Sequence, residues 1–147
     1  VDVLLTRPTL PGLGETVERL IEKNVGRINF WHMAAEGKAA DQAKEMIPTL
    51  EESAGTISAI MDSHTGTTFR AFYFPFCLLQ DNMPNVWHPL EEDAYILTPQ
   101  ESFFLEAGQI DLGVFTAKCD GCKMRTQCFG LRQSYLDLHG DDELKPL

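Results

Sequence analysis

The chain has little positive charge and no long apolar run. Its 147 residues include 12 lysines and arginines against 22 aspartates and glutamates, so the net charge is −10. Nucleic-acid binding needs a concentrated basic surface, and we therefore expect no nucleic-acid partner. No apolar stretch reaches the roughly 20 residues of a transmembrane helix, so we expect no membrane partner either. Apolar residues at 44% and charged residues at 23% are typical of a globular chain with a core.

The motifs of several common enzyme classes are also missing. The sequence contains no nucleophile elbow, no phosphate-binding loop and no dinucleotide-binding glycine pattern, and it singles out no catalytic residue. No basic segment followed by an apolar one opens the chain, as a secretion signal would. We therefore expect a cytoplasmic protein, in a compartment where clustered cysteines bind metals more often than they form disulfides.

Cysteine is scarce and unevenly placed. No cysteine precedes Cys77, and the other three fall within ten positions in CDGCKMRTQC, at Cys119, Cys122 and Cys128. A C-x-x-C pair can point two thiolates from one tight turn at the same metal, and Gly121 supplies the backbone freedom for that turn. Cys77 follows a predicted strand, where α/β sheets present functional groups. We therefore predict that Cys77 completes a four-thiolate set.

Four thiolates suit either Zn²⁺ or a [4Fe–4S] cluster. A zinc ribbon usually pairs two C-x-x-C turns, whereas this chain has one such turn and a distant single cysteine. The spacing favours the cluster. Zinc in a non-catalytic binding module is the alternative, and a chain without metal stays open. His88 and His139 are predicted in loops, where either could replace a cysteine ligand.

The first half of the chain alternates short apolar strands with amphipathic helices. Strands are predicted at residues 1–6, 27–33 and 67–76. Two helices between them place apolar residues on one face: first Leu13, Val17, Leu20 and Ile21, and then Ile57, Ile60 and Met61. The order β-α-β-α-β predicts an α/β fold with parallel strands, and specifically a partial (β/α) barrel over residues 1–80.

The second half has no such period. We predict a loop, short strands around Tyr95–Leu97 and Ser102–Leu105, the cysteine segment, and a short helix within residues 130–140. Residues 81–147 are therefore predicted to form a small cysteine-rich loop and hairpin domain. His32, at the end of the second strand, is by its residue type most simply a hydrogen-bonded structural histidine.

Four segments resemble the C-terminal half of a radical S-adenosylmethionine (radical SAM) protein that carries a SPASM- or twitch-type auxiliary iron–sulfur domain: VDVLLTRPTLPGLGETVERLIEKNVGRINFWHMAAEGKA, IPTLEESAGTISAIMDSHTG, FRAFYFPFCLL and CDGCKMRTQCFGLRQSYLDLHGDDELKPL. The last segment is the most specific. In it, C-x2-C-x5-C is followed by a glycine, a Tyr-Leu pair, a second glycine and Glu-Leu-Lys-Pro. In this family, auxiliary clusters pass electrons or position a substrate, often a peptide or protein being modified.

The resemblance implies a set of site residues. One auxiliary [4Fe–4S] cluster would be ligated by Cys77, Cys119, Cys122 and Cys128. Residues near the ends of the barrel strands would face the substrate or cofactor cavity, namely Asn29, Trp31 and His32.

One departure from the family pattern limits the expected activity. The family holds its SAM-cleaving cluster with C-x3-C-x2-C on an early barrel loop, and this chain has no cysteine before Cys77. We therefore expect S-adenosylmethionine only in a longer or complemented protein. The first residue, Val1, is not Met, which fits the expectation that the other half of the barrel belongs to a longer protein or to another chain. A relative that kept only the auxiliary site is the third alternative.

Overall fold

A parallel sheet of four strands forms the centre of the computed structural model, which describes residues 1–35, 37–88, 95–97, 99–104 and 113–147. Its strands, in spatial order, are β1 (Asp2–Leu5), β2 (Arg27–His32), β3 (Thr68–Phe72) and β4 (Val86–Trp87). Spatial neighbours thus follow one another in the chain. A separate antiparallel pair contains β5 (Tyr95–Leu97) and β6 (Ser102–Phe104). The prediction of an α/β fold with parallel strands is confirmed, but the described strands form an open sheet rather than a closed barrel.

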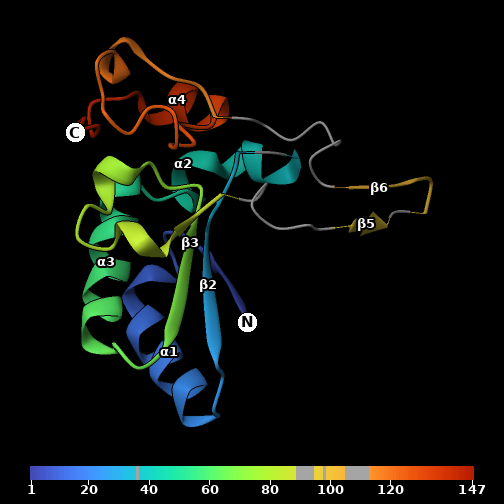
Figure 1. The fold of residues 1–147 in the computed structure, drawn as a ribbon. Helices are drawn as coiled ribbons and strands as arrows, with labels where there is room; N and C mark the ends of the chain where they lie inside the picture. The colour runs from blue at the N-terminus through green and yellow to red at the C-terminus, as the bar shows by residue number, and fades with distance from the viewer. Residues whose placement is uncertain (36, 89–94, 98, 105–112) are drawn as a thin grey trace.

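Two long helices, α1 (Leu13–Glu22) and α3 (Leu50–Ser63), cover one face of the sheet (Figure 1). Their apolar stripes bury Val17 and Ile57 in the same core as Ile28 and Phe30 of β2. The remaining helical elements are short: α2 (Ala43–Met46), α4 (Gln133–His139), and the 3₁₀ turns η1 (Leu10–Gly12), η2 (Gly37–Gln42), η3 (Phe76–Leu78), η4 (Met83–Asn85) and η7 (Ala117–Cys119). Within the described residues, no helix combines the length and the apolarity needed to cross a bilayer.

On the other face of the sheet, the described residues place no helix (Figure 1). Side chains alternate along β2, so that Phe30 and His32 are buried on the helix side while Asn29 and Trp31 lie on the open side. Leu4 of β1, which pairs with Trp31, is 51% exposed there. All-parallel sheets are normally covered on both faces, so this open face lacks its usual cover among the described residues.

The third strand is shorter than predicted. We expected it to continue to residue 76, but β3 ends at Phe72 because Tyr73 has a φ of 67°. That left-handed conformation breaks the extended backbone and is unfavourable for a residue with a Cβ. The reversal turns Phe74 into the core, where it is 1% exposed. The prediction that this strand continues through residues 73–76 is therefore wrong.

The C-terminal segment packs at the carboxyl end of the sheet (Figure 1). Leu131, Tyr135 and Leu144 belong to the same hydrophobic core as the sheet and its helices. The two regions divided by the predicted boundary at residue 80 therefore share one core among the described residues.

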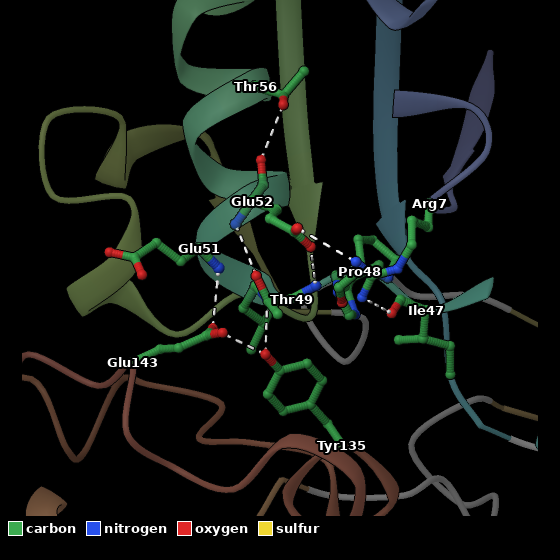
Figure 2. A network of polar contacts seen from close by, with 11 residues as sticks. Arg7, Ile47, Pro48, Thr49, Glu51, Glu52, Thr56, Tyr135 and Glu143 are labelled. Carbon is green, nitrogen blue, oxygen red and sulfur yellow. Dashed lines mark hydrogen bonds and ion pairs between the residues drawn. The ribbon is translucent and has the colours of Figure 1, made fainter. Parts of the chain in front are cut away.

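Tyr135 ties this segment to the first turn of α3 (Figure 2). Its hydroxyl accepts a hydrogen bond from the backbone amide of Leu50 at 2.8 Å and donates one to the carboxylate of Glu143 at 2.9 Å. The same Glu143 oxygen accepts the amide of Glu51 at 3.0 Å. Helix N-termini leave their first amides without intrahelical partners, so two of these amides are satisfied from the C-terminal segment.

A capping box provides hydrogen-bond partners for further amides at the same helix end, and its two residues are close in sequence. The side chain of Thr49 accepts the amide of Glu52 at 3.1 Å, and the carboxylate of Glu52 accepts the amide of Thr49 at 2.9 Å. Arg7 adds a hydrogen bond to the carbonyl of Ile47 at 3.2 Å (Figure 2). The start of α3 is thus a junction for the sheet, the helix layer and the C-terminal segment.

We predict that Tyr135→Phe lowers the free energy of unfolding by about 1–3 kcal/mol, because the buried amide of Leu50 loses its partner. Urea denaturation measures this change. The matched control is Tyr95→Phe, whose hydroxyl bonds Ser102 on the exposed hairpin and whose loss should cost less than about 0.5 kcal/mol. Equal losses in the two variants would contradict the role given to Tyr135.

Candidate metal centre

Cys77 lies in a tight turn just after β3. The turn is closed by hydrogen bonds from the amide of Leu78 to the carbonyl of Pro75 and from the amide of Leu79 to the carbonyl of Phe76, both at 3.1 Å. Leu79 anchors the turn because its side chain is 1% exposed. The thiol is half-buried at the carboxyl end of the sheet.

The other three cysteines lie on a loop that is pinned at its base. Val114 and Leu131 exchange backbone hydrogen bonds of 2.6 and 2.9 Å in an isolated antiparallel bridge. Within the loop, the amide of Cys122 bonds the carbonyl of Cys119 at 3.2 Å, and the amide of Cys128 bonds the carbonyl of Met124 at 2.9 Å. Short hydrogen-bonded turns therefore fix where each cysteine leaves the backbone.

All four thiols line one small pocket. Cys77 reaches it from the sheet, and Cys119, Cys122 and Cys128 reach it from the pinned loop. The remaining wall is mostly apolar and is made by Pro75, Phe76, Phe115, Met124, Gly130, Leu144 and Pro146. Arg125 is the one charged residue in this lining. The structure thus brings together the four residues predicted from cysteine spacing.

The pocket makes an uncompensated thiolate unfavourable. Burial raises the pKa of the Cys77 thiol, and repulsion from the other three cysteines raises it further. A hydrogen bond from the backbone amide of Lys145 acts in the opposite direction. The amide of Gly130 also donates to the sulfur of Cys128, at 3.4 Å. Four thiolates in this pocket therefore require a cation to compensate their charge, and the sulfur of Cys128 already has an amide donor of the kind that tunes metal sites.

The thiols do not form a tight single-ion set. Among the described residues, no group of three or more His, Cys, Asp or Glu side chains is placed to hold a metal ion. Zinc binds sulfur at about 2.3 Å, so a tetrahedral site needs sulfurs within about 3.8 Å of one another. A four-iron cluster binds each thiolate through a different iron and so spreads its ligands around a larger body. Both groups would draw on the same four cysteines of the pocket.

The other predicted site residues lie elsewhere. Asn29 and Trp31 share the open face, where both donate hydrogen bonds to one carboxylate oxygen of Asp2, at 2.8 and 3.0 Å. His32 points to the opposite, buried face, where its ring bonds the carbonyl of Pro48 at 3.1 Å. It does not share a surface with Asn29 and Trp31. Neither His88 nor His139 is among the residues that line the cysteine pocket.

Aromatic rings connect the cysteine loop to the open face. Phe129, next to Cys128, lies 5.3 Å from Tyr73 between ring centroids, and Tyr73 lies 5.7 Å from Trp31. The guanidinium of Arg132 packs 3.3 Å over the ring of Tyr73. Sequence reasoning did not single out Tyr73 or Phe129, because these contacts join residues far apart in the chain.

No protein-family model, curated protein or solved structure matches this chain. The geometry of the cysteine pocket and of the open face therefore carries the functional assignment.

We predict that His32 makes stability depend on pH. Burial, together with the nearby positive charges of Arg132 and His139, lowers the pKa of His32 from 6.5 to about 4. Between these values the unfolded chain binds a proton that the folded chain does not bind. The free energy of unfolding should therefore fall as the pH falls from 6.5 to 4, by on the order of 3 kcal/mol.

Urea unfolding at several pH values measures this slope. His32→Gln should flatten it, whereas His64→Gln, at the end of α3, should keep it. A slope that survives in the His32 variant would show that another group is responsible.

Two glycines of the cysteine loop offer a second test. Both have a left-handed φ, 79° at Gly121 and 80° at Gly130. A Cβ at Gly130 would lie 2.5 Å from the carbonyl oxygen of Val114, whereas nothing lies within 4 Å of one at Gly121. Gly121→Ala should therefore cost about 1–2 kcal/mol from backbone strain alone. Gly130→Ala should cost clearly more, because it also forces open the bridge at the base of the loop. Equal costs in urea denaturation would argue against the pinned loop.

Proposed function

We propose that this chain is the auxiliary-cluster region of a radical SAM enzyme. Its proposed cluster is one [4Fe–4S] group ligated by Cys77, Cys119, Cys122 and Cys128. The observation that carries this proposal is the shared pocket: thiols separated by 42 positions in the sequence line the same apolar cavity. Without a common ligand, such a gathering of half-buried thiols has no stabilising role that hydrophobic side chains would not fill better.

The cysteine spacing and the lining favour an iron–sulfur group over a single ion. The four cysteines come from one C-x-x-C turn and two single positions rather than from the two such turns of a zinc ribbon, and they share one pocket whose walls are mostly apolar. When bound, a cluster of this kind accepts or donates one electron at a potential set by its thiolates, by hydrogen bonds to sulfur and by burial. The amide of Gly130, which donates to the sulfur of Cys128, would supply one of those hydrogen bonds.

The sheet supports a role within a partial barrel. In (β/α) barrels, sequential strands are neighbours and all helices lie outside, which is the arrangement of β1 to β4 with α1 and α3. The open face would then be the barrel interior, completed by a longer chain or by another chain. S-adenosylmethionine and a substrate, for which a peptide or protein is the leading class, would bind on that side.

Asn29 and Trp31 are the residues of this chain that would meet a substrate or cofactor there. Trp31 also begins the series of ring contacts through Tyr73 to Phe129, next to Cys128. This continuity supports electron transfer between the cluster and the open face, or positioning of a substrate near the cluster. The alternative use of the same four thiols is a zinc-stabilised binding module, in which the metal would only hold the segment together.

Protein purified without oxygen should decide between the two metals. We predict brown protein with broad absorbance near ~410 nm and about four irons per chain. Cys77→Ala should remove most of this iron, because the ligand from the sheet is lost. Met124→Leu is the matched control: it changes another sulfur side chain of the lining, which is not a proposed ligand, and should keep the iron.

Two outcomes would overturn the proposal. Colourless protein with about one zinc per chain would support the binding module instead. Full iron content in Cys77→Ala would show that the sheet does not contribute a ligand.

A further inference from the structure

Residues 141–147 cross the cysteine pocket as a strap. Leu144 is 8% exposed, belongs to the hydrophobic core, and lines the pocket together with Pro146. The strap therefore forms part of the wall that separates the four thiols from solvent.

One set of contacts fastens the strap to the cysteine loop. The ammonium of Lys118 bonds the carbonyl of Asp141 at 2.9 Å and the carboxylate of Asp142 at 3.1 Å. The backbone amide of Lys123 donates to the carbonyl of Leu147 at 2.9 Å. Lys118 and Lys123 directly flank the C-x-x-C pair, so the strap is held on both sides of it.

A second set fastens the strap to the sheet unit. The carboxylate of Glu143 accepts the amide of Glu51, and the ammonium of Lys145 pairs with the carboxylate of the same Glu51 at 2.7 Å. The strap therefore joins α3, which belongs to the sheet unit, to the loop that carries Cys119, Cys122 and Cys128.

These fastenings are easily released. The side chains of Lys145 and Glu51 are 63% and 60% exposed, and that of Asp142 is fully exposed. Exposed ion pairs contribute little to stability and are screened by salt. Leu144 is the one deeply buried side chain of the strap. Opening of the strap would withdraw Leu144 from the core and release the hydrogen bonds of Glu143, while the pairing of the strands, which involves no strap residue, stays in place.

We propose that the strap is a latch on the cysteine pocket. When it is closed, Leu144 and Pro146 cover part of the pocket and slow the access of iron, chelators and oxygen to the four cysteines, which stay partly exposed; when it is released, this access is faster. The identity of the guarded group rests on the proposed function, whereas the latch itself rests on contacts that need no metal.

The latch is tested first on metal-free, reduced protein. Iodoacetamide labels each cysteine, and mass spectrometry follows the rate at each position. Lys145→Met should speed the labelling of Cys77 by about two- to five-fold at low salt, because one exposed ion pair is lost. Leu144→Ala should speed it by about ten-fold or more, because the buried anchor is lost. Lys23→Met, after α1 and far from the pocket, should keep the wild-type rate.

Salt provides an internal check on the same samples. Raising it should speed labelling in the wild-type chain more than in Lys145→Met, where the ion pair is already absent. In iron-loaded protein, an iron chelator should strip the metal faster from Lys145→Met and Leu144→Ala, by ratios similar to those for labelling.

Wild-type labelling rates at Cys77 in both folded strap variants would overturn the latch, whether or not the protein binds iron. A chain that binds no iron but shows the predicted labelling would overturn the proposed function and leave the latch in place.

Discussion

The hydroxyl of Tyr135 is the interaction on which the arrangement of the site depends. It lies between the first amide of α3 and the carboxylate of Glu143, and so fixes the C-terminal segment against the end of the sheet. Cys77 belongs to the sheet side of this junction, and the other three cysteines belong to the segment that Tyr135 holds. A pocket lined by four thiols forms only when both sides are locked in register. The first amides of α3 thus find hydrogen-bond partners in the C-terminal segment, and these bonds hold that segment beside the candidate metal centre.

The features of the pocket that favour metal binding work against the stability of the metal-free fold. Burial and the neighbouring cysteines raise the pKa of the Cys77 thiol, so the metal-free pocket disfavours its thiolate. A metal group reverses both effects, since it requires thiolates and gains from an apolar surround. The metal-free fold is therefore held by neighbouring features: the capping of α3, the bridge between Val114 and Leu131, and the strap.

Sequence patterns predicted the first strands and the long helices well, because the spacing of apolar residues shows directly which side of an element is buried. The first two strands and both long helices follow from alternating and helical apolar spacing, and the grouping of cysteines predicted which thiols share a pocket. The reversal at Tyr73 carries no local signal, since neither glycine nor asparagine occupies the left-handed position. The short strand β4 was not predicted, because two residues are too few to show a period. The hydrogen bond between the amide of Leu50 and Tyr135 was not predicted either, because it joins residues 85 positions apart.

A crystal structure of the anaerobically loaded protein, with data collected at the iron absorption edge, tests the central claim most directly. A cluster held by all four cysteines would give one compact iron peak in anomalous difference density within the pocket, bonded to Cys77 as well as to Cys119, Cys122 and Cys128. A zinc signal in place of iron would contradict it. So would an iron peak held by the loop cysteines alone, with the sulfur of Cys77 unbound.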